Sequence, residues 1–359
     1  MHISAGRLGF AGLIHEFVSE GCLMKAMVMQ DTGSAVSQEE RQRPEPGVDE
    51  VLIRVRACGV CHSDLAVQQG AFPFAQFPLV PGHEVAGVVE EAGENVEWPQ
   101  KGQRVGMPWL YDSCGHCEQC TAGDEVLCNE VQVTGVTRDG GYAEYMIAPA
   151  SYAVPIPDAL SDSEAGPLMC AGLTVHNGLK RAEFRPGEKV AVIGLGGLGH
   201  LAVLYARAMG ARVAVLSGSP DKEGEARELG AERFINTKEK SLADALQQWD
   251  GGADIVLATS PSGELMSQAV NGLAQDGRLV VLGAAGDEIE AAPAALIMGR
   301  RKIMGVPSGS RKDARDALAF AASHDIRPRV TERPLEDADD VLKEMADGRL
   351  RDRVVLTFG

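Results

Sequence analysis

The sequence has few positive charges and no long apolar run. Its 34 Lys and Arg residues are outnumbered by 51 Asp and Glu residues, which gives a formal net charge of −17. Such a surface repels phosphate backbones and anionic lipids, and the one basic cluster, "GRRKIMG" at 299–305, is short. No apolar run has the length needed to cross a bilayer. We therefore expect neither a nucleic-acid partner nor a membrane partner.

Features of export are also missing from the start of the chain. The first residues include Glu16 and Glu20 and lack the basic segment and long apolar segment of a secretory signal. We expect a cytoplasmic protein whose eight cysteines are metal ligands or catalytic groups, not a disulfide framework. Regular alternation begins near Met24, so residues 1–23 are expected to form a poorly ordered extension, not a functional arm.

The length of 359 residues exceeds what one hydrophobic core normally supports, so two domains are expected. Short alternating apolar runs, cut by Gly and Pro, predict a strand-rich, barrel-like domain over 24–172. Over 173–304, buried-type strands alternate with helical segments, which predicts a parallel sheet covered on both faces. Residues 305–359 are too few for a third domain and are expected to return to the first.

A glycine motif lies between a predicted strand and a predicted helix. In "VAVIGLGGLGHLAV", Gly194, Gly196 and Gly199 have G-x-G-x-x-G spacing, with Gly197 and Leu198 between them. The first glycine allows a tight turn, the second lets the backbone approach a pyrophosphate, and the third lets the helix pack on the strand. With the following strand "RVAVLS", the motif favours dinucleotide binding over a structural turn.

The end of that second strand bears on which dinucleotide binds. NAD sites usually have Asp or Glu there, whereas this chain has Ser217, Gly218 and Ser219, followed by Lys222. Hydroxyl groups and a nearby cation suit a 2′-phosphate, so NADP(H) is favoured. Asp221 keeps NAD(H) open, and an ordinary turn is a further interpretation.

Four cysteines form a cluster within one loop. Cys114, Cys117, Cys120 and Cys128 have the spacing C-x2-C-x2-C-x7-C. Four thiolates provide the closed tetrahedral shell of a structural zinc site. An iron-sulfur cluster is the rival interpretation, but the wide last spacing and the lack of a Cys-Pro ending disfavour it.

Candidate ligands of a second metal are far apart in the sequence. They are Cys61, His83 with its neighbour Glu84, and Cys170. Two thiolates and one imidazole would leave the fourth zinc position open, as a catalytic site requires. Each residue alone is weak evidence, since a single buried cysteine or histidine is usually structural. Cys58 and Cys61 also have C-x-x-C spacing, which leaves a thiol redox pair open.

Several motifs in the same order resemble the zinc-dependent alcohol dehydrogenases of the medium-chain dehydrogenase/reductase family, in its cinnamyl alcohol or bacterial primary alcohol branch. They are "GVCHSDL", "PGHEVAGVV", the four-cysteine loop, "GGYAEY", "GLGGLG" and "RVVLTF", which span nearly the whole chain from Met24. The resemblance implies an α/β protein with two domains. A GroES-like β-barrel catalytic domain (24–172 and 305–359) would hold a catalytic and a structural zinc, and a Rossmann domain (173–304) would bind the cofactor. It also implies a homodimer or homotetramer.

The resemblance further implies a role for each candidate around the catalytic zinc. Cys61, His83 and Cys170 would bind the metal. Glu84 would lie behind it as an alternative ligand, and Asp64 would orient the imidazole of His83.

Other positions match the cofactor and substrate sites of the family. Ser63 would take the alcohol proton, while His62 and Arg353 would lie near the cofactor pyrophosphate. Trp109 matches an aromatic wall of the substrate pocket, although a tryptophan is as often a core residue. Cys58 matches no ligand position, so a redox pair is disfavoured and Cys58 is expected in the core.

The predicted function is zinc-assisted hydride transfer between a small primary alcohol and a nicotinamide cofactor, with aldehyde reduction as the reverse reaction. A non-catalytic nucleotide-binding relative is an alternative, but the full set of Cys61, Ser63, His83 and Cys170 favours an enzyme. Polyol dehydrogenases commonly lack the four-cysteine loop, so its presence favours the alcohol branch.

One position departs from the family pattern and generates a test. Many relatives continue the proton relay to a histidine at the position occupied here by Ala66, so His62 or water must complete the transfer. We predict that Ala66→His flattens the dependence of alcohol oxidation on pH, because a titratable group would then carry the proton onward. Initial rates measured across pH check this, and a profile identical to that of the wild type would contradict it.

Overall fold

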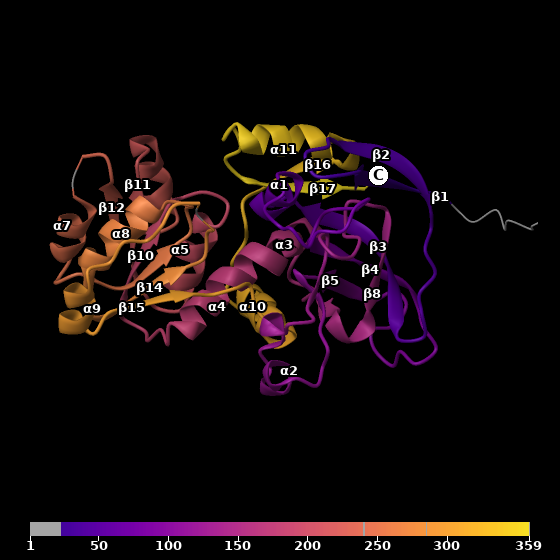
Figure 1. The fold of residues 1–359 in the computed structure, drawn as a ribbon, viewed down its shortest axis with the longest axis horizontal. Coiled ribbons are helices and arrows are strands. Elements are labelled where there is room, and N and C mark those ends of the chain that lie inside the picture. Colours follow the sequence, from indigo (N-terminus) through magenta and orange to yellow (C-terminus); the bar gives the residue numbers. More distant parts are fainter. Residues whose placement is uncertain (1–22, 240, 285, 359) are drawn as a thin grey trace, which may run out of the picture.

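Two large β-sheets organise the computed structural model, which describes residues 23–239, 241–284 and 286–358 (Figure 1). The extension expected over residues 1–23 lies outside the described residues except for Leu23, which begins strand β1. Within the described ranges, no helix is both long enough and apolar enough to cross a membrane.

The first sheet has seven strands in the order β16-β17-β3-β4-β5-β9, with β8 paired to β3. Its strands are β3 (Glu50–Gly59), β4 (Glu84–Ala92), β5 (Arg104–Met107), β8 (Tyr145–Pro149), β9 (Val154–Pro155), β16 (Val330–Pro334) and β17 (Arg353–Thr357). The last strand of the chain pairs antiparallel with β3 and sets Val355 opposite Gly59. The chain therefore returns, after the second sheet, to β3, the strand that ends just before the predicted ligand Cys61.

Smaller elements surround this sheet. They are the hairpin β1 (Leu23–Met29) and β2 (Val36–Gln42), the strand pair β6 (Leu110–Asp112) and β7 (Gln132–Val133), and helices α1 (His62–Gln68), α2 (Glu118–Ala122), α3 (Asp162–Pro167) and α11 (Ala338–Ala346). The N–H of Val36 donates to the Asp339 carboxylate at 2.9 Å, which ties the hairpin to α11.

The second sheet has six strands in the order β12-β11-β10-β13-β14-β15, all parallel. Its strands are β10 (Lys189–Ile193), β11 (Arg212–Ser217), β12 (Arg233–Asn236), β13 (Ala253–Ala258), β14 (Leu273–Val281) and β15 (Lys302–Gly305). Its helices are α5 (Gly199–Ala208), α6 (Glu223–Glu228), α7 (Leu242–Gln247), α8 (Gly263–Gly272) and α9 (Pro293–Gly299). The strand order reverses beside β10, where open parallel sheets bind ligands beyond the carboxyl ends of their strands.

Two helices lie between the sheets, α4 (Leu173–Arg181) and α10 (Arg311–Ser323) (Figure 1). Helix α10 begins with a capping box, in which Ser310 Oγ accepts from the N–H of Asp313 and the Asp313 carboxylate accepts from the N–H of Ser310. Lys180 Nζ of α4 lies 2.6 Å from the same carboxylate, which is only 2% exposed. The α/β fold expected from the sequence, a β-rich unit and a doubly wound parallel sheet, is confirmed.

Candidate functional site

Four candidate ligands meet in one place although they come from three segments. Cys61 precedes α1, His83 precedes β4, Glu84 begins β4, and Cys170 lies in a π-helical turn over Leu168–Gly172. One ligand atom from each lies within 4.8 Å of those of the others. The structure therefore brings together the residues expected at the second metal site. π-Helical turns are rare and are frequently found at functional sites.

The donor chemistry of this set fits zinc. Nδ1 of His83 lies 3.1 Å from the Asp64 carboxylate, to which it can donate, so in the neutral ring that binds a metal the lone pair is on Nε2. Nε2 is buried and has no hydrogen-bond partner among the described residues. An unpaired buried polar atom costs free energy, and a metal ion held by this nitrogen and the thiols of Cys61 and Cys170 would remove that cost.

The orienting carboxylate of Asp64 is itself held firmly. It is 1% exposed, and Oδ2 accepts from the N–H of Cys61 at 2.8 Å and from the hydroxyl of Tyr142 at 3.1 Å. These bonds leave Oδ1 for His83. The sequence prediction missed Tyr142, although the motif "GGYAEY" contains it.

The thiols of Cys61 and Cys170 shift each other's pKa in opposite directions, so that Cys61 is the one favoured as a thiolate. A hydrogen bond from Cys170 lowers the pKa of Cys61 well below its ordinary value, and His83 lowers it further, against the effect of burial. The same hydrogen bond, with burial, raises the pKa of Cys170. By contrast, burial raises the pKa of Cys58, which is fully buried and lies outside the ligand set.

Behind the ligands lies a buried ion pair between Glu84 and Arg353. The two side chains are 0% and 6% exposed, and a guanidinium N–H of Arg353 donates to Oε1 of Glu84. Burial raises the pKa of Glu84 to about 7 although Arg353 opposes the shift. A Cβ on Gly59 would lie 2.0 Å from Oε2 of Glu84, and a Cβ on Gly197 would lie 2.7 Å from Cδ of Arg353. Arg353 therefore reaches both the ligand set and the glycine motif.

The remaining candidates lie next to Cys61 or next to His83. Ser63 Oγ is 3.8 Å from Sγ of Cys61, and His62, the first residue of α1, is exposed. The ring of Trp109 meets the ring of His83 edge-on, with the ring centres 5.0 Å apart, and Phe72 lies 5.6 Å from Trp109. Aromatic rings therefore border the set next to its histidine.

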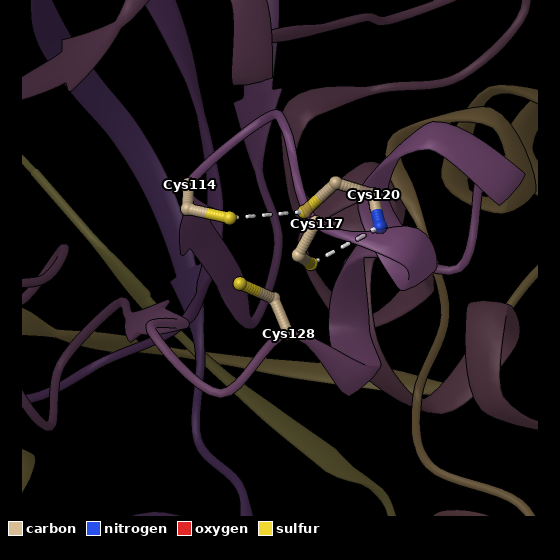
Figure 2. Close-up of side chains that lie close together, drawn as sticks. All are labelled: Cys114, Cys117, Cys120 and Cys128. Atoms are coloured by element: carbon tan, nitrogen blue, oxygen red, sulfur yellow. Dashed lines mark hydrogen bonds between the residues drawn. The ribbon is translucent and has the colours of Figure 1, made fainter.

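The four-cysteine cluster forms a second set (Figure 2). The side chains of Cys114, Cys117, Cys120 and Cys128 point toward one another, and their sulfur atoms all lie within 4.8 Å. Sulfur atoms around a tetrahedral zinc are separated by about 3.8 Å, and Sγ of Cys114 and Sγ of Cys120 are 3.9 Å apart. A hydrogen bond with Ser113, 3.2 Å away, lowers the pKa of Cys120 to about 7. The spacing and chemistry fit a closed zinc shell.

The glycine motif adopts the close packing predicted from its spacing. Gly194 has a φ of +90°, which favours glycine, and its N–H donates to Leu216 O at 2.8 Å. A Cβ on Gly199, the first residue of α5, would lie 2.2 Å from the carbonyl oxygen of Gly194. The turn and the helix start therefore both depend on the absence of side chains.

The residues expected to determine whether NADP(H) or NAD(H) binds lie at the end of β11. Ser217 is buried, and its hydroxyl accepts from the N–H of Ser219 at 3.2 Å. Lys222 Nζ donates to Leu195 O, within the glycine motif, at 2.7 Å. Asp221 lies 3.9 Å from Arg351, a contact between exposed side chains.

One cation near this strand end was missed by the sequence prediction. Lys238 Cε lies 3.1 Å from where a Cβ on Gly218 would be. Lys238 follows β12, the strand beside β11, and no spacing rule links it to the glycine motif.

Comparisons with known proteins agree with both halves of the fold. The family model described as alcohol dehydrogenase GroES-like domain matches residues 47–158, and the zinc-binding dehydrogenase model matches residues 197–323. An alcohol dehydrogenase of Geobacillus stearothermophilus is 41% identical over 334 residues, which are 93% of this chain and 99% of the relative.

Solved structures extend the likeness to three dimensions. A cinnamyl alcohol dehydrogenase from Sorghum bicolor has a TM-score of 0.86 and 30% identity, over 94% of this chain and 98% of that one. A zinc-binding dehydrogenase from Sinorhizobium meliloti bound to NADP has a TM-score of 0.85 and 28% identity, over 94% and 100%. Other structures of this fold were solved with NADP(H) or with NAD, so the likeness leaves the cofactor preference open.

The contact between Gly59 and Glu84 generates a prediction. Gly59→Ala should push the Glu84 carboxylate away from Arg353, and breaking a buried ion pair costs about 3–5 kcal/mol of folding stability. Gly224→Ala is the matched control, because a Cβ there meets nothing among the described residues within 4 Å. Thermal unfolding followed by circular dichroism should show a lower midpoint for Gly59→Ala alone. Equal midpoints for the two variants would contradict the packing argument.

Proposed function

Since this chain belongs to the zinc-dependent alcohol dehydrogenases of the medium-chain dehydrogenase/reductase family, we propose that it transfers a hydride between a primary alcohol and NADP(H). Zinc-dependent alcohol oxidoreduction is the activity of the family, and the proposal adds the alcohol class, the cofactor and the residues. The observation that carries it is the ligand set of Cys61, His83 and Cys170, which Arg353 joins to the glycine motif.

We propose two zinc sites in each subunit, one catalytic and one structural. Zinc at the first would act as a Lewis acid on the alcohol oxygen. Asp64 keeps the lone pair of His83 on Nε2, directed away from the carboxylate. Glu84 is an alternative ligand, because Oε2 is buried without a hydrogen-bond partner in the described part of the chain. Cys114, Cys117, Cys120 and Cys128 bind the structural zinc.

The proton of the alcohol passes, in this proposal, to Ser63. Ser63 lies beside Cys61 at the start of α1, so its hydroxyl borders the ligand set. His62 is exposed next to it, and Ala66 offers no titratable group one turn further along the helix. The proton therefore leaves through His62 or through water. Trp109 forms a wall of the substrate pocket beside His83.

Four side chains near the end of β11 support NADP(H). Ser217 and Ser219 offer hydroxyl groups, Lys222 lies on the glycine motif, and Lys238 approaches Gly218 from the neighbouring strand. Two cations and two hydroxyl groups favour a 2′-phosphate. NAD(H) is the second candidate, because Asp221 lies in the same segment and its contact with Arg351 is long and exposed.

We also propose the domain limits, assembly and location. The catalytic domain comprises 24–172 and 305–359, supported by the pairing of β17 with β3, and the Rossmann domain comprises 173–304. A homodimer or homotetramer is supported by the edge strand β15 and by Ile297 and Met298 of α9, which are 75% and 81% exposed. A cytoplasmic location is supported by the cysteine ligands, because thiols stay reduced in the cytosol.

The test is a set of initial rates with a panel of aldehydes and alcohols, each supplied with NADPH or NADH, NADP⁺ or NAD⁺. Faster turnover with NADPH and aldehydes, and with NADP⁺ and primary alcohols, supports the proposal. A preference for NADH would instead support NAD(H) as the cofactor. No turnover by the zinc-loaded protein with either cofactor would favour a non-catalytic nucleotide-binding protein.

Two variants separate the cofactor assignments. If Lys222 faces a 2′-phosphate, Lys222→Ala should weaken NADPH binding about tenfold, the loss of one charged hydrogen bond, and NADH binding much less. Asp221→Asn should leave NADPH binding unchanged. Dissociation constants from cofactor fluorescence check both. The NAD(H) alternative requires the opposite, with Asp221→Asn weakening NADH binding.

A further inference from the structure

His200, the residue after the last glycine of the motif, uses both ring nitrogens in hydrogen bonds. It is 3% exposed, and Nε2 lies 3.2 Å from the backbone nitrogen of Arg329. A backbone N–H only donates, so Nε2 must accept and the ring proton must be on Nδ1. Nδ1 then donates to the carbonyl oxygen of Gly196, 3.2 Å away. The imidazole is therefore a bridge of one defined tautomer between two backbone segments.

The bridge stays neutral at ordinary pH. Burial lowers the pKa of His200 to about 4, and the charges of Arg353 and Arg329 add to this effect, against the hydrogen bond to Gly196. The ring therefore keeps an acceptor for the N–H of Arg329 throughout the neutral range.

At one end the bridge fixes a peptide of the glycine motif. The carbonyl oxygen of Gly196 also accepts from the backbone N–H of His200 at 3.0 Å, so two donors hold it toward α5. The C=O and N–H of a trans peptide point in opposite directions. The N–H of Gly197 is therefore turned away from the helix, where the N–H groups at a helix start are available to an anion.

At its other end the bridge holds the segment that precedes β16. The N–H of Arg353 donates to Arg329 O at 3.0 Å, and the guanidinium of Arg329 pairs with Glu225 of α6 at 3.0 Å. The side chain of Arg353 fills the space that a Cβ on Gly197 would need. His200, Arg329 and Arg353 thus connect the glycine motif with the strand pair β16 and β17, and Arg353 continues to the ligand set.

We propose that His200 is a positioning residue. It holds the Gly196–Gly197 peptide at a fixed place relative to Arg353 and, through Arg353, relative to the metal-ligand set. The inference rests on the proposed cofactor site at the glycine motif. His200 acts through Gly196 and Arg329, not by contact with reacting atoms.

Three substitutions separate the contributions of the two hydrogen bonds that His200 makes. The amide of His200→Gln can donate to Gly196 and accept from Arg329, the shorter His200→Asn keeps only the first bond, and His200→Leu keeps neither. His176→Leu is the matched control. His176 is also a buried histidine with a lowered pKa, and its Nδ1 lacks a partner in the described ranges.

Two measurements on the zinc-loaded full chain test the bridge. Fluorescence titration gives the dissociation constants of NADPH and NADH, and hydrogen exchange without cofactor follows the amides of 194–200 and 326–332. We expect His200→Leu to weaken binding of both cofactors about tenfold and to speed exchange in both segments. His200→Asn should speed exchange in 326–332 only, and His200→Gln should stay within about twofold of the wild type.

Wild-type binding and exchange in His200→Leu would overturn the inference. So would equal weakening in His176→Leu, because the effect would then follow from the loss of any buried imidazole. If the wild-type protein binds neither cofactor, the proposed function fails, whereas the exchange measurement still decides whether the bridge exists.

Discussion

The buried ion pair between Arg353 and Glu84 is the interaction on which the arrangement of the site depends. Taking a guanidinium and a carboxylate out of water costs several kcal/mol for each, and only close pairing offsets it. Gly59 makes room for the carboxylate and Gly197 makes room for the guanidinium, because a Cβ at either would clash. The pair therefore constrains β3, β4, β17 and the glycine motif together.

This constraint gives a physical reason for the pairing of β17, the last strand, with β3. Residues of β17 pair with Ala57, Cys58 and Gly59, just ahead of Cys61. Any shift of β17 would separate Arg353 from Glu84 and leave a buried charge unpaired. The ligand set and the glycine motif lie on different sheets, and β17, through Arg353, fixes their positions relative to each other. Hydride transfer requires this fixed relative position, because the alcohol and the nicotinamide must approach within contact distance.

The features predicted well from the sequence are those whose residues lie within one short segment. The four-cysteine loop and the glycine motif each lie within a short segment, so spacing alone indicated their chemistry. Cys61, His83 and Cys170 are far apart in the chain, so their donor chemistry made them only weak candidates until the family resemblance gave each a role. Tyr142, His200 and Lys238 were missed because their contacts, with Asp64, Arg329 and Gly218, form only when distant segments pack. The Arg353–Glu84 contact was missed for the same reason, although both residues were expected near the site.

The proposed chemistry requires two zinc sites in one chain, one closed by four sulfur atoms and one left open beside the cofactor motif. Both sites can be located by anomalous diffraction from crystals of the purified protein, recorded on both sides of the zinc absorption edge. We expect two peaks in each subunit, one among the four sulfur atoms of the cysteine loop and one bounded by Cys61, Cys170 and Nε2 of His83. A missing second peak, or a peak in the cysteine loop that follows the iron edge instead, would contradict the proposal of two zinc sites.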